Sequence, residues 1–279
     1  EVLFREELPS GLERTVCTVP GEAGYEILCC MLRPLEGERF PALVFAHGAG
    51  GHIVDACGFG RETYHNDCMF EIARQGYLTV TYAMRGLGTS DFGRPEWEPM
   101  LYDDIVGYTL NRGACAMNVW VYDGLQVLDA LRVHEAVDPA RIGFAGMSHG
   151  GQVAMYAGGL APDRVACVIA MGSMISFDTI YGEVHNMTGH ALPGIARVCD
   201  MGDLGGLVAP RPMLVQWGAL ERSGRHSQLR DSSLREFEVT RSVYERLGAA
   251  ERVVPRITPG RDHHFDVPAA IEFLDGFLR

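Results

Sequence analysis

Short apolar runs alternate along the chain with longer segments in which apolar residues recur at helical spacing. Six apolar runs bounded by glycine, proline or charge predict buried strands, at 41–47, 77–83, 141–146, 164–171, 212–217 and 252–258. Helical spacing with charge on the opposite side predicts helices at 62–75, 119–133, 149–160, 235–247 and 267–278. This alternation predicts an α/β fold, in which a mostly parallel central sheet carries helices on both faces.

Two kinds of segment depart from this alternation. The apolar segments 13–19 and 25–32 are separated by Pro20 and Gly21, which favour a turn, so we expect an N-terminal antiparallel hairpin. The connections 84–118 and 172–211 are too long for simple turns, and long loops on such a scaffold commonly carry binding residues. No repeat or flexible linker interrupts the sequence. We therefore expect a single domain, residues 1–279, with these two connections as pocket-shaping insertions.

Composition narrows the class of protein and of partner. The formal net charge of −12 opposes binding to nucleic acid or to an acidic membrane surface, so a small-molecule substrate is the expected partner. No apolar run reaches the roughly 18 residues that a membrane span needs, and we expect a soluble chain. The eight cysteines are scattered or lie in apolar runs, as Cys29, Cys30 and Cys167 do, which favours buried free thiols in the reducing cytoplasm over disulfides or a zinc site. The sequence leaves a homo-oligomer open.

A candidate nucleophile stands out in RIGFAGMSHGG (141–151), where Ser148 occupies the centre of a G-x-S-x-G motif. The motif follows a predicted strand and precedes a predicted helix, which is the context that gives it chemical meaning. A serine on such a sharp turn adopts strained geometry, and side chains at Gly146 or Gly150 would collide with neighbouring backbone. Gly151 lets the helix approach the sheet. We therefore predict that Ser148 is the catalytic nucleophile.

Backbone amides that could stabilise an oxyanion are expected at the end of the first parallel strand. The segment HGAGG (47–51) is rich in small residues, so its N–H groups can face a developing negative charge. We assign one donor to the amide of Ala49 and the second to that of His149, the residue after the nucleophile. His47 is expected to brace this loop rather than to carry protons.

A serine hydroxyl needs a base, and in proteins with this motif the order along the chain is serine, acid, histidine. The segment TPGRDHHFD offers His263 and His264 after the last predicted strand, and only one of two neighbouring loop residues can face Ser148. We favour His263, and expect His264 to pack or to face solvent. His185 and His190 lie in the second insertion, where solvent-exposed histidines are the commoner case although either could line a pocket.

The acid that orients the histidine should follow the strand before it. Glu221 is the first carboxylate after PMLVQW (212–217), and its task is to fix the imidazole tautomer and stabilise the imidazolium. An exposed glutamate that pairs with a nearby arginine is the alternative for this position. Asp178, shortly after the preceding strand, is the reserve acid.

Four segments together resemble the α/β-hydrolase superfamily, and more narrowly its dienelactone hydrolase and acetyl xylan esterase-like branch. The resemblance spans roughly residues 40–279 and rests on YAMRGLGTSD (82–91), VDPARIGFAGMSHGG (137–151), DLGGLVAPRPMLVQWGALE (203–221) and GRDHHF (260–265). It implies the α/β-hydrolase fold, no cofactor, and a base at the histidine two residues before Phe265, which is His263. The branch usually has aspartate at Glu221, and dienelactone hydrolases have cysteine at Ser148, which argues against dienelactone chemistry in the narrow sense.

The function expected from these residues is hydrolysis of a carboxylic ester with a short acyl group or a small alcohol, through an acyl-enzyme on Ser148. The same three side chains can serve a peptidase or a C–C bond hydrolase, because a fold and a triad do not fix the scissile bond. A ligand-binding protein with a weak triad is an alternative of another class, since Glu221 departs from the usual aspartate.

Overall fold

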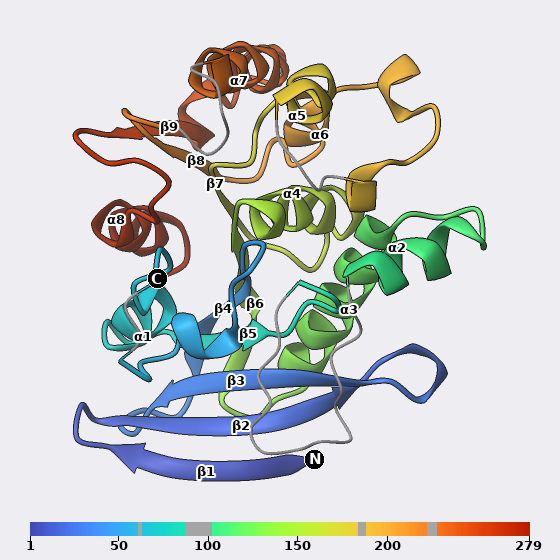
Figure 1. The fold of residues 1–279 in the computed structure, drawn as a ribbon. Coiled ribbons are helices and arrows are strands. Elements are labelled where there is room, and N and C mark those ends of the chain that lie inside the picture. The colour runs from blue at the N-terminus through green and yellow to red at the C-terminus, as the bar shows by residue number, and fades with distance from the viewer. Residues whose placement is uncertain (61–62, 88–101, 184–187, 222–227) are drawn as a thin grey trace.

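A mostly parallel sheet forms the centre of the fold. The computed structural model describes residues 1–60, 63–87, 102–183, 188–221 and 228–279. Within these residues nine strands form one sheet in the order β1-β2-β3-β5-β4-β6-β7-β8-β9 (Figure 1). Strands β4 to β9 run parallel, whereas β1, β2 and β3 are antiparallel to their neighbours. The strands are β1 Val2–Leu8, β2 Leu12–Pro20, β3 Glu26–Pro34, β4 Phe40–Ala46, β5 Leu78–Tyr82, β6 Val137–Met147, β7 Val168–Met171, β8 Met213–Gly218 and β9 Val253–Thr258.

The hydrophobic core lies on both faces of this sheet, as strand β4 shows. Ala42, Val44 and Ala46 pack into the core that includes residues of helices α3, α4 and α7, whereas Leu43 and Phe45 pack into the core under α1 and α8. Figure 1 shows α1 and α8 on one side of the sheet and α3 and α4 on the other. Because both faces are covered, β4 is apolar and buried throughout. The helices are α1 Cys68–Ala73, α2 Tyr102–Leu110, α3 Ala116–Arg132, α4 His149–Leu160, α5 Phe177–Glu183, α6 Met201–Gly206, α7 Gln228–Arg246 and α8 Val267–Phe277.

The predicted strands are confirmed, with one addition. The six apolar runs correspond to β4 to β9, and the N-terminal hairpin to β2 and β3. Strand β1 was not predicted. Its pairing with β2 shifts register between Val2 and Phe4, which breaks the alternation of buried and exposed positions that would mark a strand in the sequence.

Helix α1 is shorter than the sequence pattern over 62–75 predicts. Asn66 and Asp67 both have φ of 49°, in the left-handed region, so a right-handed helix cannot pass through them. The helix therefore begins at Cys68, and the preceding residues are free to form a loop. The other four predicted helices are present as α3, α4, α7 and α8, with α7 beginning at Gln228 instead of near residue 235.

The two predicted insertions meet over α3. The first contributes α2, and the second contributes α5, α6 and the short 3₁₀ helix η3 (Thr188–His190); residues 88–101 and 184–187 of these insertions lie outside the described residues. The amide of Gly189 donates a hydrogen bond of 2.7 Å to the Tyr102 hydroxyl, which joins η3 to α2. Among the described helices, none combines the length and the apolar character that a bilayer crossing requires.

Candidate active site

Ser148 lies at a sharp turn between β6 and α4. Its φ of 57° and ψ of −121° are unusual for a residue with a side chain, as predicted for a strained strand-to-helix turn. The Ser148 amide donates a hydrogen bond of 2.7 Å to the carbonyl oxygen of Met171 at the end of β7, and the residue is half-buried. The turn is thus held by the neighbouring strand, with the serine at the carboxyl end of the parallel sheet.

The glycines of the motif are required by close backbone contacts. A Cβ atom at Gly146 would lie 2.0 Å from the carbonyl oxygen of Gly150, and one at Gly150 would lie 1.9 Å from that of Ala46. A Cβ atom at Gly151 would lie 2.4 Å from Ser173 Oγ. These distances are far below van der Waals contact, so the turn and the approach of α4 to β4 exclude a side chain at Gly146 and Gly150, whereas a side chain at Gly151 would displace Ser173.

Glu221 and His263 form a hydrogen-bonded pair. His263 Nδ1 lies 2.5 Å from Glu221 Oε1, and the Glu221 side chain is 1% exposed. The second carboxylate oxygen accepts the Gly218 amide at 3.3 Å. A buried carboxylate beside Nδ1 favours the tautomer with a proton on Nδ1, which leaves Nε2 as a proton acceptor. Glu221 is therefore a buried partner of an imidazole and not the exposed surface glutamate of the alternative interpretation.

His263 lies close to the sharp turn that carries Ser148. Gly172 follows Met171, whose carbonyl anchors Ser148, and a Cβ atom at Gly172 would lie 2.4 Å from His263 Cε1. The imidazole of His263 therefore packs against Gly172, the residue after Met171, whose carbonyl binds the Ser148 amide. Only a glycine at position 172 allows this contact. His264 turns to another neighbour, because its Nδ1 lies 2.8 Å from Asn66 Nδ2. Of the two histidines, the structure pairs His263 with the acid; Asp178 is exposed on α5.

His47 braces the loop that follows β4. Its Nδ1 donates to the Gly48 carbonyl at 2.8 Å, and its Nε2 accepts the Met84 amide at 3.1 Å. Burial lowers the pKa of His47 to about 4, so the ring is neutral at physiological pH. The expectation of a structural histidine at this position is confirmed.

Some backbone amides of the loop after β4 donate a hydrogen bond within the protein, and others do not. Gly48 N–H donates to His65 Nε2 at 2.9 Å, Gly50 N–H to the Leu87 carbonyl at 3.0 Å, and Gly51 N–H to the Gly48 carbonyl at 3.1 Å. Within the described residues, the Ala49 amide has no hydrogen-bond partner. Residues that begin a helix have amides without an intrahelical acceptor, and His149 is the first residue of α4. Both amides predicted to bind an oxyanion are thus without a hydrogen-bond partner among the described residues.

Tyr64 and His65 belong to this site although nothing in the sequence marked them. The Tyr64 hydroxyl donates to the Ala49 carbonyl at 2.7 Å, and its ring centroid lies 5.9 Å from that of His263. His65 is completely buried beside the same loop. A lone Tyr-His pair inside a predicted helix gives no motif, so only the folded chain brings the two residues to the loop.

A second pair of histidines lies behind the nucleophile. The rings of His149 and His190 are 4.3 Å apart between centroids, and each lies about 6 Å from Trp120, at 6.0 and 5.8 Å. Neither ring nitrogen of either histidine has a hydrogen-bond partner within the described part of the chain. Of the two possibilities left open for His190, solvent exposure does not hold, because η3 packs on α3 and buries the residue; His185 lies outside the described residues.

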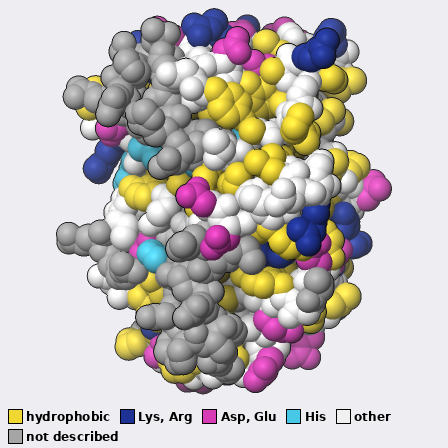
Figure 2. Space-filling view, turned by 45° about the vertical axis from the view of Figure 1, so that its right-hand side comes forward, with side chains coloured by type: hydrophobic (Ala, Val, Ile, Leu, Met, Phe, Trp, Pro, Cys, Tyr) yellow, Lys and Arg dark blue, Asp and Glu magenta, His cyan; other side chains and the backbone are white. Residues whose placement is uncertain are grey.

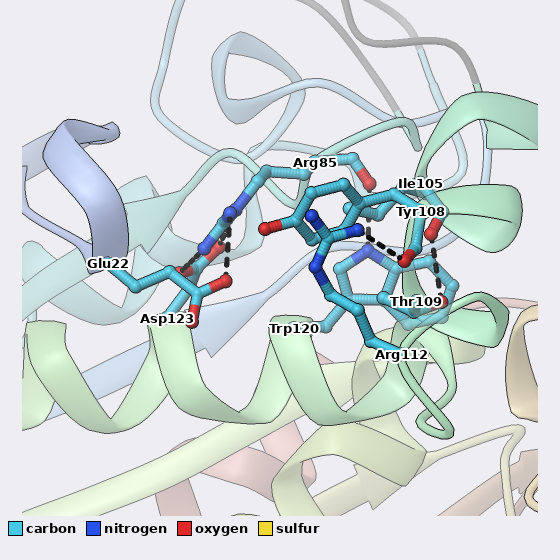
Figure 3. Close-up of polar contacts among 8 residues, drawn as sticks. All are labelled: Glu22, Arg85, Ile105, Tyr108, Thr109, Arg112, Trp120 and Asp123. Atoms are coloured by element: carbon cyan, nitrogen blue, oxygen red, sulfur yellow. Dashed lines mark hydrogen bonds and ion pairs between the residues drawn. The ribbon is translucent and has the colours of Figure 1, made fainter.

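The first insertion is fastened to α3 by a buried ion pair (Figure 3). Arg85 donates to both carboxylate oxygens of Asp123, with Nε at 2.7 Å from Oδ2, and both side chains are at most 5% exposed. The Arg85 carbonyl accepts the Trp120 indole N–H at 2.8 Å, and Glu22 lies 3.7 Å from the guanidinium. Because Met84 and Leu87 bond to the loop after β4, this ion pair also supports that loop.

An apolar cavity of about 220 Å³ lies between α3 and α4, next to the second insertion. Figure 2 shows hydrophobic side chains gathered on the visible face, and Leu160 at the rim of the cavity is exposed. The cavity is lined by Cys115, Met117, Asn118, Val121, Tyr122, Leu125, Tyr156, Leu160 and Leu192. A second apolar hollow shares Leu192 with it. Neither hollow is lined by Ser148, Glu221 or His263.

Comparison with known proteins agrees with this fold. The family described as the alpha/beta hydrolase fold matches residues 41–198, and the chain belongs to this family. It is similar to a Bacillus subtilis (strain 168) protein named as a hydrolase, YtaP, with 25% identity over 253 residues, which cover 85% of this chain and 79% of that protein.

Two solved structures share nearly the whole fold. A protein named as an acetyl xylan esterase from Bacteroides fragilis NCTC 9343 has a TM-score of 0.79 at 15% identity, covering 99% of this chain and 82% of its own. A glucuronoyl esterase from Solibacter usitatus has a TM-score of 0.69 at 16% identity, covering 99% and 84%. The predicted resemblance to the α/β-hydrolases is confirmed, and a protein named for the acetyl xylan esterase branch is among the similar structures.

Proposed function

We propose that this chain is a serine hydrolase that cleaves carboxylic esters of short acyl groups or small alcohols, without a cofactor. Ser148 is the nucleophile, His263 the base and Glu221 the acid that orients it. The observation that carries the proposal is the 2.5 Å contact between His263 Nδ1 and Glu221 Oε1, with the ring resting on Gly172 beside the anchor of Ser148. A buried carboxylate bound to Nδ1 directs the basic Nε2 away from itself.

His263 takes up and returns a proton in each of two steps, the formation and the hydrolysis of the acyl-enzyme. As Ser148 Oγ bonds to the acyl carbon, Nε2 takes the hydroxyl proton, and it returns this proton to the alkoxide when the ester C–O bond breaks. Water then enters, loses a proton to Nε2 and attacks the acyl-enzyme. When the bond between the acyl carbon and Ser148 Oγ breaks, Nε2 returns this proton to Oγ, so the carboxylic acid leaves and the Ser148 hydroxyl is restored. Glu221 remains ionised and stabilises the imidazolium in both steps.

The negative oxygen that forms in each step is assigned to the amides of Ala49 and His149. Both are unbonded among the described residues, and they come from the loop after β4 and from the start of α4. The positive potential at the N-terminus of α4 adds to the stabilisation that the His149 amide gives the oxyanion. Loss of one such donor typically lowers kcat by about 10² to 10³.

Ester cleavage is the reaction that the comparisons favour. YtaP is named as a hydrolase, and both similar structures are named as esterases. The net charge of −12 supports a small-molecule partner and not a nucleic acid. A cytoplasmic location belongs to the same proposal, since all eight cysteines carry free thiols.

The experiment that tests the proposal compares the wild type with Ser148→Ala. A fluorophosphonate probe is expected to label the wild type at Ser148, and the variant is expected to lose both labelling and turnover of p-nitrophenyl acetate. Ser242→Ala is the matched control, because in the described part of the chain the Ser242 hydroxyl bonds to the Val239 carbonyl of its own helix, α7, and to nothing at the site. Turnover that survives in Ser148→Ala would contradict the mechanism.

A panel of esters, peptide amides and β-diketones distinguishes the ester reaction from peptide or C–C cleavage by the same triad. Preference for amides or diketones would replace the ester assignment. Ligand binding with turnover far below the roughly 10 s⁻¹ that is typical of enzymes would favour a binding protein.

A further inference from the structure

Three consecutive residues contact three different parts of the site. The Tyr64 hydroxyl bonds to the Ala49 carbonyl, His65 Nε2 accepts the Gly48 amide, and Asn66 Nδ2 lies 2.8 Å from His264 Nδ1, next to the proposed base. Asn66 has a positive φ of 49°, so it closes a turn before α1 instead of extending the helix. This segment therefore joins the loop after β4 to the loop that carries His263.

The hydrogen bond to His65 fixes the state of its ring. A backbone amide can only donate, so Nε2 must be unprotonated and the neutral ring carries its proton on Nδ1. Burial and the nearby histidines His47 and His263 lower the pKa of His65 to about 3. The acceptor is thus present throughout the neutral pH range.

The peptide that carries the Ala49 amide is held at its oxygen. In a trans peptide the C=O and N–H groups point in opposite directions, and the Gly48 carbonyl accepts His47 Nδ1 and the Gly51 amide. The Ala49 N–H must therefore point away from these donors. Its direction is correct only while the flanking peptides keep their places, and these are held by the Gly48 amide on His65 and the Ala49 carbonyl on Tyr64.

The His65 ring is itself fixed by close packing. Its centroid lies 4.1 Å from that of Tyr64, and it meets Phe45 edge-on at 6.1 Å. A Cβ atom at Gly51 would lie 2.2 Å from His65 Cε1, so the loop wraps directly around the ring. Nδ1 has no hydrogen-bond partner among the described residues, so the amide of Gly48 is the polar contact that this buried ring makes.

We propose that His65 is a positioning residue for the oxyanion hole, and that Tyr64 assists it. His65 occupies the Gly48 amide and holds its peptide, so that the Ala49 amide is the one that this loop offers to the oxyanion, opposite the amide of His149. A buried imidazole with one unpartnered nitrogen is costly compared with an apolar side chain of similar size, which a purely space-filling role would favour. The inference rests on the proposed function and deepens it.

The test uses a conservative and a disruptive variant of the full chain. Glutamine can offer an amide oxygen near the place of Nε2, whereas leucine cannot accept a hydrogen bond. With p-nitrophenyl acetate, His65→Leu is expected to lower kcat by about 10- to 100-fold with KM within about threefold, since the affected donor acts in the transition state. His65→Gln is expected to restore kcat to within about fivefold of the wild type.

Tyr64→Phe provides a variant that keeps the packed ring and removes only the hydroxyl bonded to Ala49. We expect it to fold normally and to lower kcat by about three- to tenfold. A trifluoromethyl ketone, which forms a tetrahedral adduct on the serine, gives a second readout. Its inhibition constant should rise in each variant by the factor by which kcat/KM falls, because both measure contact with the oxyanion.

Two results would overturn the inference. One is an unchanged kcat in His65→Leu and Tyr64→Phe. The other is a loss of activity in His65→Leu that glutamine does not restore and the ketone does not follow. Failure of the proposed function is distinguishable, because it would leave turnover intact in Ser148→Ala; if Ser148 is essential and the His65 series has no effect, only the positioning role is wrong.

Discussion

Glu221 follows β8 and His263 follows β9, and their side chains meet at 2.5 Å where these two neighbouring parallel strands end. The loops that carry them are bonded to each other, because the Leu220 amide donates to the Arg261 carbonyl at 2.9 Å. A Cβ atom at Gly218 would lie 2.2 Å from the Asp262 carbonyl oxygen, so the two loops are in direct contact. The pair is therefore set by the backbone before any substrate arrives.

The first prediction concerns this pair. Glu221→Gln should lower kcat for p-nitrophenyl acetate by about 10³- to 10⁴-fold, because a neutral amide neither stabilises the imidazolium nor fixes the tautomer with the proton on Nδ1. Glu221→Asp keeps the charge but is one methylene shorter, and should retain more activity than the glutamine variant. Equal activity in wild type and Glu221→Gln would assign the acid to another residue.

The second prediction concerns the close contact between α4 and β4. Gly150→Ala should destabilise the protein by about 3 kcal/mol or more, because its new methyl group would lie 1.9 Å from the Ala46 carbonyl oxygen. Gly276→Ala is the matched control: this glycine lies in α8 with no atom within 4 Å of its Cβ position, and alanine there should stabilise by up to about 1 kcal/mol. Urea unfolding measures both changes.

The third prediction compares two ion pairs of different burial. Asp123→Ala should cost about 3 to 5 kcal/mol in the free energy of unfolding, since it removes the buried carboxylate that bonds to the Arg85 guanidinium and leaves the half-exposed Glu22 at 3.7 Å. Asp129→Ala removes the surface partner of Arg164, whose side chain is 28% exposed, and should cost less than about 1 kcal/mol. Similar losses in the two variants would mean that the Arg85 network is not anchoring the first insertion.

The fourth prediction concerns the stability of the protein at low pH. Burial lowers the pKa of His149 to about 4 and that of His190 well below its usual 6.5. Between pH 6.5 and 4 these histidines are therefore protonated in the unfolded chain but neutral in the folded protein. The free energy of unfolding is highest above pH 6.5 and falls as the pH drops towards 4.

His190→Leu removes one of these groups and should weaken the decline by about 1.4 kcal/mol per pH unit across this window. At pH 7.5 the variant should be at least as stable as the wild type, because it removes two buried nitrogens without hydrogen-bond partners within the described residues. Urea midpoints at pH 7.5, 5.5 and 4.5 provide the measurement, and an unchanged slope would contradict the prediction.

The strands and the residues of the proposed triad could be identified from the sequence because their signals are local. Buried parallel strands are continuous apolar runs, as β4 is. The turn at Ser148 requires glycine at positions 146 and 150, which gives a recognisable spacing in the sequence. Local signals failed where the chain departs from regular geometry: the register shift at Val2 and Phe4 concealed β1, and the left-handed residues Asn66 and Asp67 shortened α1.

The contacts that complete the site are not local. His65 lies 17 residues from Gly48 in the sequence, and Tyr64 lies 15 from Ala49, so no spacing rule connects them. His190 appeared solvent-exposed because it lies in a long insertion, yet packing on α3 buries it beside His149. The roles of these residues depend on contacts between segments that are distant in the sequence, and a local sequence pattern does not reveal such contacts.

Among the described residues, β1 is the outer strand on one side of the sheet, and one row of its backbone donors and acceptors has no neighbouring strand. Arg5, Glu6 and Glu7 lie side by side along it, and Glu6 pairs with Arg14 of β2. Charges on an outer strand oppose the addition of another chain, since a newcomer would have to desolvate them. The charged outer strand β1 therefore opposes edge-to-edge association of the sheet with another chain.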